Sequence, residues 1–221
     1  MCFSAEASFV ASGVLAVVGV ASLKKAESPE QTPFAAIPFL FAVQQFAEGV
    51  LWMGIGNSRA DPLNQISIYI FLILAQVVWP IWVPWSVLMI EKDVVRKKII
   101  KGIMAMGIAV SLYLSYCLLT YDVNAEIYSG HIKYTLDFPL LPVWVTHVFY
   151  FIATVTPLFV SSRKRMSLLG IMILTSFIVA KLHFATHLIS IWCYFAALIS
   201  IAVWWITSYF KETHMTILPR S

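Results

Sequence analysis

Residues 66–90 read ISIYIFLILAQVVWPIWVPWSVLMI and contain no charged side chain. A helix needs about 20 predominantly apolar residues to cross the hydrocarbon core of a bilayer, and this stretch is longer than that. A transmembrane β-barrel would show short segments of alternating hydrophobicity instead. The stretch therefore predicts a membrane-spanning helix. Tryptophans and prolines near its end predict a bend and an anchor at the headgroup boundary, at Trp79, Pro80, Trp82, Pro84 and Trp85.

The composition of the whole chain agrees with a membrane protein. Of its 221 residues, 60% are hydrophobic and 12% are charged, and the mean hydropathy is +0.84. A soluble domain of this size could not bury so much apolar surface. This excludes a cytosolic enzyme, a secreted disulfide scaffold and a disordered chain. Basic residues have another role in membrane proteins, so the net charge of +4 does not indicate a nucleic-acid partner.

Seven stretches are long enough to span, and we expect one all-α domain over residues 1–221, a seven-transmembrane helix bundle. Apolar character runs almost unbroken from Ser167 to Phe210, which is too long for one crossing at about 1.5 Å per residue. We place a turn within this run, at the polar group Lys181, His183, Thr186 and His187; alternatively, the last helix begins near His183 and the sixth is short. The predicted spans are Ala5–Leu23, Pro33–Gly54, Ile66–Ile90, Ile99–Leu119, Leu140–Val160, Ser167–Ala185 and Ile191–Phe210.

The distribution of basic residues predicts the orientation. Of the 15 Lys and Arg side chains, 12 fall in the connections on one side of the predicted bundle and 3 on the other, at Arg59, Lys133 and Lys181. The positive-inside rule then places the N-terminus outside and the C-terminus in the cytoplasm. If the last two helices were a single span, the basic residues after it would change sides and the distribution would be less uneven. The uneven distribution therefore favours seven spans.

The polar side chains within the predicted spans collect in the extracytoplasmic half. Ionisable groups inside a span usually face the bundle interior or a water-filled cavity. We therefore predict a polar pocket in this half, and the loop Tyr121–Phe138 is long enough to cover its mouth. The predicted pocket residues are Gln44, Gln45, Trp52, Tyr150 and Cys193, together with Glu48 and His147.

One face of the second span combines a carboxyl group with two amides. Gln44, Gln45, Glu48 and Trp52 follow helical spacing. Two interpretations remain open: a binding or catalytic role for Glu48, or a hydrogen-bonded clamp between helices in which Glu48 is protonated.

The histidines suggest a metal site. His183 and His187 have the i, i+4 spacing with which zinc hydrolases hold their metal. With Glu48 or His147 as a third ligand they could bind Zn²⁺ and leave a position open for water. A turn at Thr186 would remove the shared face. In the alternative, His183 and His187 are interfacial residues, and His147, which shares a stripe with Tyr150 and Thr154, is an interhelical hydrogen-bond donor.

The three cysteines are expected at the extracytoplasmic end, where a disulfide is permitted. We expect a bridge between Cys2 and Cys193, with Cys117 free. Removal of Met1 would alternatively leave Cys2 as an N-terminal nucleophile whose own amine acts as the base.

Three short blocks resemble a family of uncharacterised bacterial multi-pass membrane proteins. They are Met1-Cys2-Phe3-Ser4-Ala5, Gln45-x-x-Glu48-x-x-x-Trp52 and Ile191-Trp192-Cys193-x-x-Ala196-Ala197. The resemblance implies a multi-pass protein of the bacterial inner membrane, with no established activity, and groups Cys2, Glu48, Trp52 and Cys193 in one site. A more distant similarity, by analogy only, is to the seven-span alkaline ceramidases and adiponectin-receptor-like proteins, whose His-x-x-x-His is imitated by His183 and His187.

Three functions follow as hypotheses. The first is a metal-assisted hydrolase or transferase acting on a lipid-like substrate, with Glu48, His147 and Cys2 as catalytic residues and zinc at His183 and His187. The second is a sensor or carrier that binds a small molecule in the predicted pocket. The third is a structural accessory subunit. Transport is disfavoured, because the inner half lacks polar groups along a path.

Overall fold

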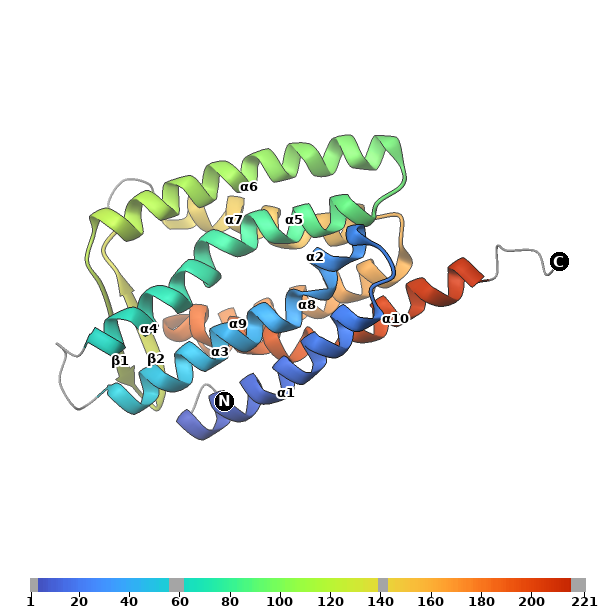
Figure 1. Cartoon of the computed structure of the whole chain (residues 1–221). Helices are drawn as coiled ribbons and strands as arrows, with labels where there is room; N and C mark the ends of the chain where they lie inside the picture. The colour runs from blue at the N-terminus through green and yellow to red at the C-terminus, as the bar shows by residue number, and fades with distance from the viewer. Residues whose placement is uncertain (1–3, 56–61, 139–142, 216–221) are drawn as a thin grey trace.

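Long helices packed side by side form the protein, with one β-hairpin across an end of the bundle (Figure 1). The computed structural model describes residues 4–55, 62–138 and 143–215. In chain order the elements are α1 (Ala5–Lys25), η1 (Pro29–Gln31), α2 (Thr32–Ala35), α3 (Ile37–Gly54), α4 (Pro62–Leu72), η2 (Ile73–Val78), α5 (Trp79–Ile90), α6 (Val94–Thr120), β1 (Val123–Tyr128), β2 (His131–Leu136), α7 (Val143–Val160), α8 (Lys164–His183), η3 (Ala185–His187), α9 (Leu188–Ile199) and α10 (Ile201–Met215).

In the described part of the chain, six helical segments are long and apolar enough to cross a membrane. They correspond to the predicted spans other than the fifth, and they are Ala5–Lys25, Pro29–Gly54, Pro62–Ile90, Val94–Thr120, Lys164–His183 and Ala185–Tyr209. The fifth predicted span corresponds to α7, whose apolar part, Trp144–Val160, is shorter. The first residues of that predicted span, 140–142, lie outside the described residues.

The break between the last two spans lies where the polar residues predicted it. Helix α8 ends at His183, and Phe184 leaves the helical conformation with φ −135° and ψ 37°. The chain resumes as the 3₁₀ turn η3 and then as α9. Helix α8 keeps 20 residues, so the sixth helix is not short, but the last apolar segment begins at Ala185, near His183, as the alternative had it.

A π-helical segment, η2, lies between α4 and α5 and precedes Pro80. Proline cannot donate to the carbonyl four residues earlier, so backbone acceptors are released here. Side chains of neighbouring helices take them up: the Tyr150 hydroxyl donates to the Ala75 carbonyl, and the Ser111 hydroxyl donates to the Val77 carbonyl over 2.7 Å. Irregular backbone at membrane depth is tolerated when such partners satisfy it.

Small residues bring helices into close contact. At Gly107 of α6, an added Cβ would lie 2.0 Å from the backbone oxygen of Pro80. On α1, an added Cβ at Gly19 would meet the backbone of Phe39, and the Ser12 hydroxyl donates to the Ala42 carbonyl of α3 over 2.8 Å. Packing through small residues and hydrogen bonds is how helices associate where the surrounding lipid is equally apolar.

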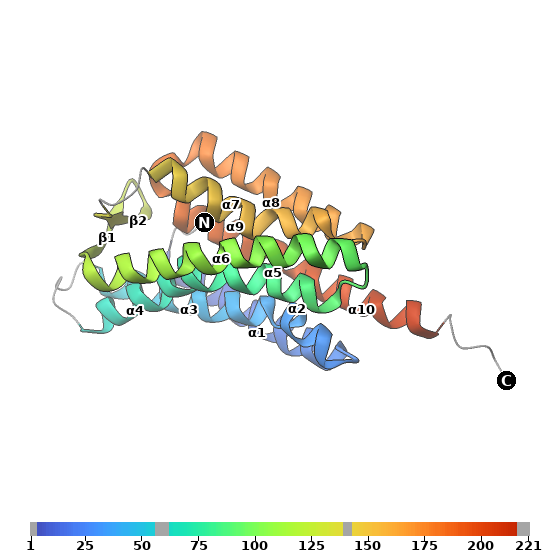
Figure 2. The ribbon, with the colours of Figure 1, turned by 90° about the horizontal axis from the view of Figure 1, so that it is seen from above.

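The hairpin lies at the end where α6 ends and α7 begins, and α10 extends from the opposite end (Figure 2). Strands β1 and β2 pair antiparallel, with Glu126 opposite Lys133. The turn residues Ser129 and Gly130 have φ of 50° and 76°. Two positive φ angles match the turn that suits the twist of a two-residue hairpin. The segment 121–138, expected as a plain loop, is therefore largely a hairpin.

Aromatic stacking fixes the hairpin to the bundle. The rings of Tyr134 and Phe71 lie parallel, with centroids 4.8 Å apart. Ile132 of β2 is fully buried, and His187 Nε2 donates to the Tyr128 carbonyl over 3.0 Å. The hairpin is thus part of the packed structure at this end.

A buried carboxylate joins two turns at the opposite end. Glu91 is 1% exposed and accepts hydrogen bonds from the Ser162 backbone and hydroxyl at 2.7 and 2.6 Å, and from the backbone of Lys92 and Asp93. Burial alone would raise the pKa of Glu91, but these hydrogen bonds lower it to about 2. The connection α5–α6 is thereby held to the connection α7–α8.

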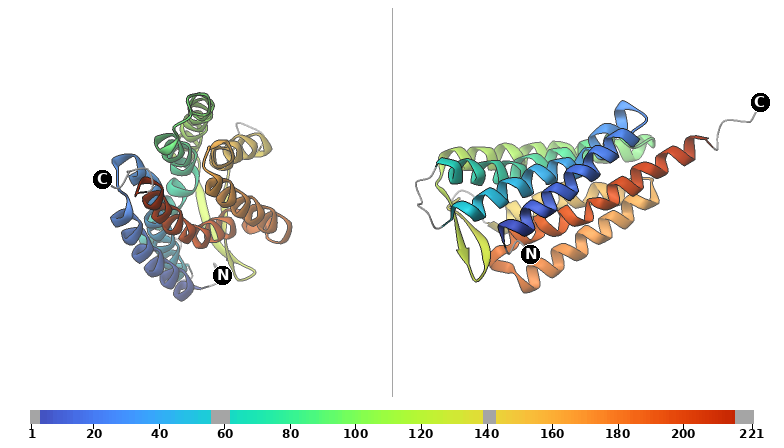
Figure 3. Two further views of the ribbon diagram at one scale, coloured as in Figure 1. Left: turned by 90° about the vertical axis from the view of Figure 1, so that its right-hand side faces the viewer. Right: turned by 60° about the horizontal axis from the view of Figure 1, so that its bottom comes forward.

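At this same end, basic side chains lie against aromatic rings of α10. Lys25 Nζ lies 4.4 Å from the ring centroid of Trp204, and the guanidinium carbon of Arg165 lies 4.0 Å from that of Trp205. Helices α1 and α10 run side by side here (Figure 3, right). Such cation–π contacts link α10 to α1 and α8.

Candidate functional site

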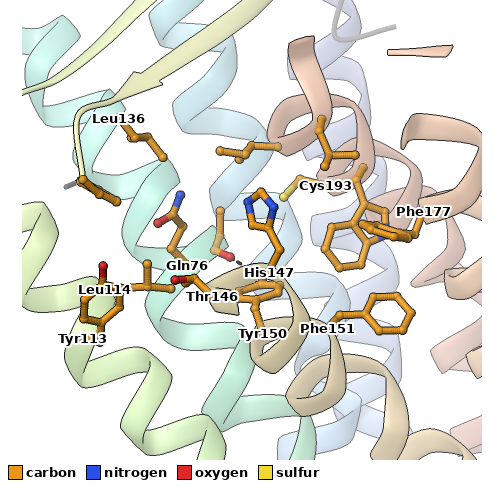
Figure 4. A pocket seen from close by; sticks show the side chains of 15 residues that line it. Gln76, Tyr113, Leu114, Leu136, Thr146, His147, Tyr150, Phe151, Phe177 and Cys193 are labelled. Atoms are coloured by element: carbon orange, nitrogen blue, oxygen red, sulfur yellow. Dashed lines mark hydrogen bonds between the residues drawn. The ribbon is translucent and has the colours of Figure 1, made fainter. Parts of the chain in front are cut away.

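A cavity of about 150 Å³ lies beneath the hairpin, between η2, α6, α7, α8 and α9 (Figure 4). Its lining includes His147 and Tyr150 on α7 and Cys193 on α9. Leu136 of β2 and Phe138 close it from the hairpin side. The 121–138 segment, which is long enough to cover a pocket mouth, thus contributes to the wall of this cavity.

The cavity is mainly apolar, and two of its lining residues have a buried polar atom without a partner. Gln76 of η2 is 8% exposed, and its Oε1 has no hydrogen-bond partner. The indole Nε1 of Trp192 is also buried and unpaired. Among the described residues that line the cavity, none is Asp, Glu, Lys or Arg. The polar contribution is therefore uncharged, apart from what His147 can supply.

A second cavity, of about 80 Å³, adjoins the first. The two share Tyr150, Trp192 and Cys193 as lining residues. Helix α7 borders both of them, with His147 at the first and Thr154 at the second, as the predicted stripe requires.

The predicted carboxyl–amide face forms a separate buried cluster between α3, α5 and α9. Gln44, Gln45 and Glu48 are fully buried. Glu48 Oε1 accepts from the Ser190 hydroxyl at 2.5 Å, and Glu48 Oε2 accepts from Gln45 Nε2 at 3.4 Å. Trp79 Nε1 donates to Gln44 Oε1 over 3.0 Å. This is the geometry of the interhelical clamp.

This cluster adjoins the cavities at Cys193, which lies next to Gln44 and Glu48. Neither Glu48 nor the two glutamines line the first cavity. Trp52 is not a lining residue either, and its indole Nε1 is buried without a partner. The predicted pocket thus divides into a clamp, containing Gln44, Gln45 and Glu48, and a cavity, containing His147, Tyr150 and Cys193.

The sequence model of a family described as a family of unknown function (DUF6629) matches residues 1–216 of this chain. The chain belongs to this family. The match confirms the resemblance carried by the Met-Cys-Phe-Ser-Ala opening and the two helical blocks. No curated protein and no solved structure matches the chain.

In this member of DUF6629 the two histidines of the zinc hypothesis do not share a helical face. His183 is the last residue of α8 and is exposed, whereas His187 is 8% exposed in η3. His187 is held by the Tyr128 carbonyl and lies 4.9 Å, ring to ring, from His131 of the hairpin. The expected i, i+4 geometry is wrong because the helix ends at His183. Among the described residues, no group of three or more His, Cys, Asp or Glu could hold a metal ion.

The described cysteines of this DUF6629 chain are both buried free thiols, Cys117 and Cys193. A free Cys193 departs from the predicted Cys2–Cys193 disulfide. Cys2 lies outside the described residues, and so does the hypothesis that it is an N-terminal nucleophile.

Several site residues were missed by the sequence reading. Gln76 is the one amide in the apolar stretch 66–90, so its position in the sequence could have indicated a polar site there. Trp79 was expected at the headgroup boundary, but it is 4% exposed and stacks on Phe41 at 4.2 Å. Nothing in the sequence pairs Ser190 with Glu48 or places Trp192 beside a cavity, because both relations depend on how distant helices pack.

Proposed function

We propose that this chain is a seven-span protein of the bacterial inner membrane that binds a small molecule in the cavity beneath the hairpin. In this proposal α7 completes the seven crossings, the hairpin end faces the outside and the C-terminus is cytoplasmic. The orientation is supported by the basic residues around Lys25, Glu91 and Arg165, which lie at the end opposite the hairpin.

Binding is supported chiefly by two residues of the cavity wall, Gln76 and Trp192, whose buried polar atoms Gln76 Oε1 and Trp192 Nε1 have no partner. Buried polar atoms are nearly always hydrogen-bonded, and leaving one unpaired costs about 1–3 kcal/mol. A ligand that bonds to these atoms would remove that cost. An engineered apolar cavity of roughly 150 Å³ holds benzene, so a site of this size suits a small molecule or one part of a larger one.

The geometry favours binding over catalysis. Glu48, the base of the hydrolase hypothesis, is engaged by Ser190 and Gln45 and does not line the cavity. His147 does line it. The assignments of Glu48, His147 and Cys2 as catalytic residues, and of zinc as cofactor, remain predictions.

The test compares molecules that copurify with three forms of the protein. Ile189→Trp fills the cavity that Ile189 lines, and the matched control Val148→Trp adds the same side chain at an exposed position on α7. Organic extracts of the native protein and of Val148→Trp should contain one species, by mass spectrometry, that the Ile189→Trp extract lacks. Equal extracts from all three, or no such species in the native protein, would contradict binding.

Thermal unfolding must show that the Ile189→Trp protein is folded. If it is not, Leu188→Phe fills the same cavity with a smaller addition. Orientation is tested separately by labelling an N-terminal tag in intact cells and in inverted membrane vesicles. Labelling only in the inverted vesicles would overturn the proposed orientation.

A further inference from the structure

We infer that the two cavities form one elongated site for an uncharged, single-chain amphiphile. Its hydroxyl group would lie in the first cavity and its alkyl chain would extend into the second. The inference rests on the proposed function, because it names the class of ligand that the site takes.

The two cavities adjoin each other along α7 and α9. Tyr150, Trp192 and Cys193 line both. On α7, Thr146 lines the first cavity and Leu158 the second. These positions are on the order of 18 Å apart along the helix at 1.5 Å per residue. A long, narrow space of small volume suits an extended chain better than a compact ring system.

The second cavity presents an apolar surface. Its hydroxyl-bearing residues already have partners, since Thr154 donates to the Tyr150 carbonyl at 2.9 Å and Ser200 donates to the Ala197 carbonyl at 2.6 Å. The Trp79 indole is bound to Gln44. The remaining walls are largely aliphatic, and they include Ile37, Val83, Leu158, Leu169, Ile173 and Val203. An alkyl chain would leave no polar atom of these walls newly unpaired.

The first cavity selects the head group by its hydrogen bonds. Gln76 Oε1 needs a donor, and Trp192 Nε1 needs an acceptor. A hydroxyl group offers both a donor and an acceptor to such residues. A carboxylate cannot donate to Gln76, and an ammonium group cannot accept from Trp192. A charged head would also be buried without an opposite charge, because no Asp, Glu, Lys or Arg is among the described lining residues.

The first experiment uses a decanol analogue with a photoreactive diazirine in the middle of its chain. After irradiation, the label should map to peptides that contain Tyr150 or Trp192. Unlabelled decanol should prevent labelling at a concentration at least tenfold lower than decanoate or decylammonium. Equal competition by the three, or labelling confined to exposed residues of the bundle surface, would overturn the inference.

The second experiment measures chain length with a cavity-filling variant. Ala196 lines the second cavity but not the first. In Ala196→Phe, the concentration of decanol that competes should rise at least tenfold, while that of hexanol should change less than twofold. The control Ala109→Phe places the same ring at an exposed position of α6 and should change neither. If Ala196→Phe does not fold, Ala196→Leu takes its place.

The outcomes separate the inference from the proposed function. Loss of hexanol and decanol competition together, or of neither, in Ala196→Phe would refute the two-cavity site. The small-molecule site itself would still stand if the Ile189→Trp protein lost its copurifying species. Only the absence of that difference would refute the proposed function.

Discussion

Ser190 donates a hydrogen bond of 2.5 Å to Glu48 and thereby joins α9 to α3 across 142 positions of the chain. Both side chains are fully buried. Glu48 also accepts from Gln45, so two donors converge on its carboxyl group. A buried group with two such partners carries a larger share of the packing specificity than its size suggests.

Replacement of Glu48 distinguishes a clamp from a reactive group. Glu48→Gln keeps an oxygen for the Ser190 hydroxyl, so we expect the free energy of unfolding in detergent to change by less than about 1 kcal/mol. Glu48→Leu removes the acceptor of both hydrogen bonds and should cost about 1–3 kcal/mol. Thermal or denaturant unfolding measures both. Equal losses in the two variants would show that the carboxyl charge, rather than its oxygens, stabilises the fold.

Gly107 should tolerate no side chain. An added Cβ would lie 2.0 Å from the Pro80 carbonyl oxygen, and backbone cannot move aside as a flexible side chain can. We expect Gly107→Ala to lower the free energy of unfolding by about 1–3 kcal/mol, through separation of α5 and α6. Gly102→Ala on the same helix is the control, because nothing lies within 4 Å of its added Cβ. That variant should be neutral or stabilising by up to about 1 kcal/mol, and a loss at Gly102 matching that at Gly107 would rule out the steric explanation.

The Tyr150 hydroxyl should stabilise the π-helical segment. It donates to the Ala75 carbonyl, one of the backbone acceptors near Pro80. Tyr150→Phe removes this donor and should cost about 1–2 kcal/mol of unfolding free energy. Tyr116→Phe, at an exposed position of α6, provides the matched control and should cost nothing measurable. A neutral Tyr150→Phe would indicate that another donor reaches Ala75.

Glu91 should make stability depend on pH in the acid range. Its pKa of about 2 in the folded protein lies below the ordinary value of 4.5. The unfolded chain therefore binds more protons between these values, and the stabilisation is complete above about pH 5 and is lost as the pH falls toward 2. The effect should be on the order of 2 kcal/mol.

Unfolding measured between pH 7 and pH 3 checks this prediction. Glu91→Gln should be less stable at pH 7 and should show a flatter dependence on pH. The control Glu126→Gln, on the half-exposed hairpin pair with Lys133, should keep the native slope. An unchanged slope in Glu91→Gln would assign the acid sensitivity to another group.

Much of the helical architecture could be predicted, because a span needs only length and hydropathy. The turn near His183 could also be found, since polar residues interrupt an apolar run that is too long for one crossing. The hairpin was missed although Ser129-Gly130 stands between alternating apolar residues. Its strands are short and carry charged residues, so a prediction based on hydropathy alone assigned them to a loop.

The site was predicted in part. Helical spacing correctly placed Gln44, Gln45 and Glu48 on a buried face. It could not decide between a clamp and a binding or catalytic role, because the donor Ser190 comes from a helix 142 positions away. The i, i+4 rule failed for His187 because the chain leaves the helix one residue after His183.

The stability of the hairpin over the cavity depends on its contacts with the rest of the bundle. A two-stranded hairpin is at best marginally stable by itself in water, so its backbone amides stay protected only while Tyr134 rests on Phe71 and His187 holds the Tyr128 carbonyl. Deuterium uptake by the cross-strand amides should therefore report how often the hairpin separates from the bundle. A bound ligand that contacts Leu136 should slow that uptake.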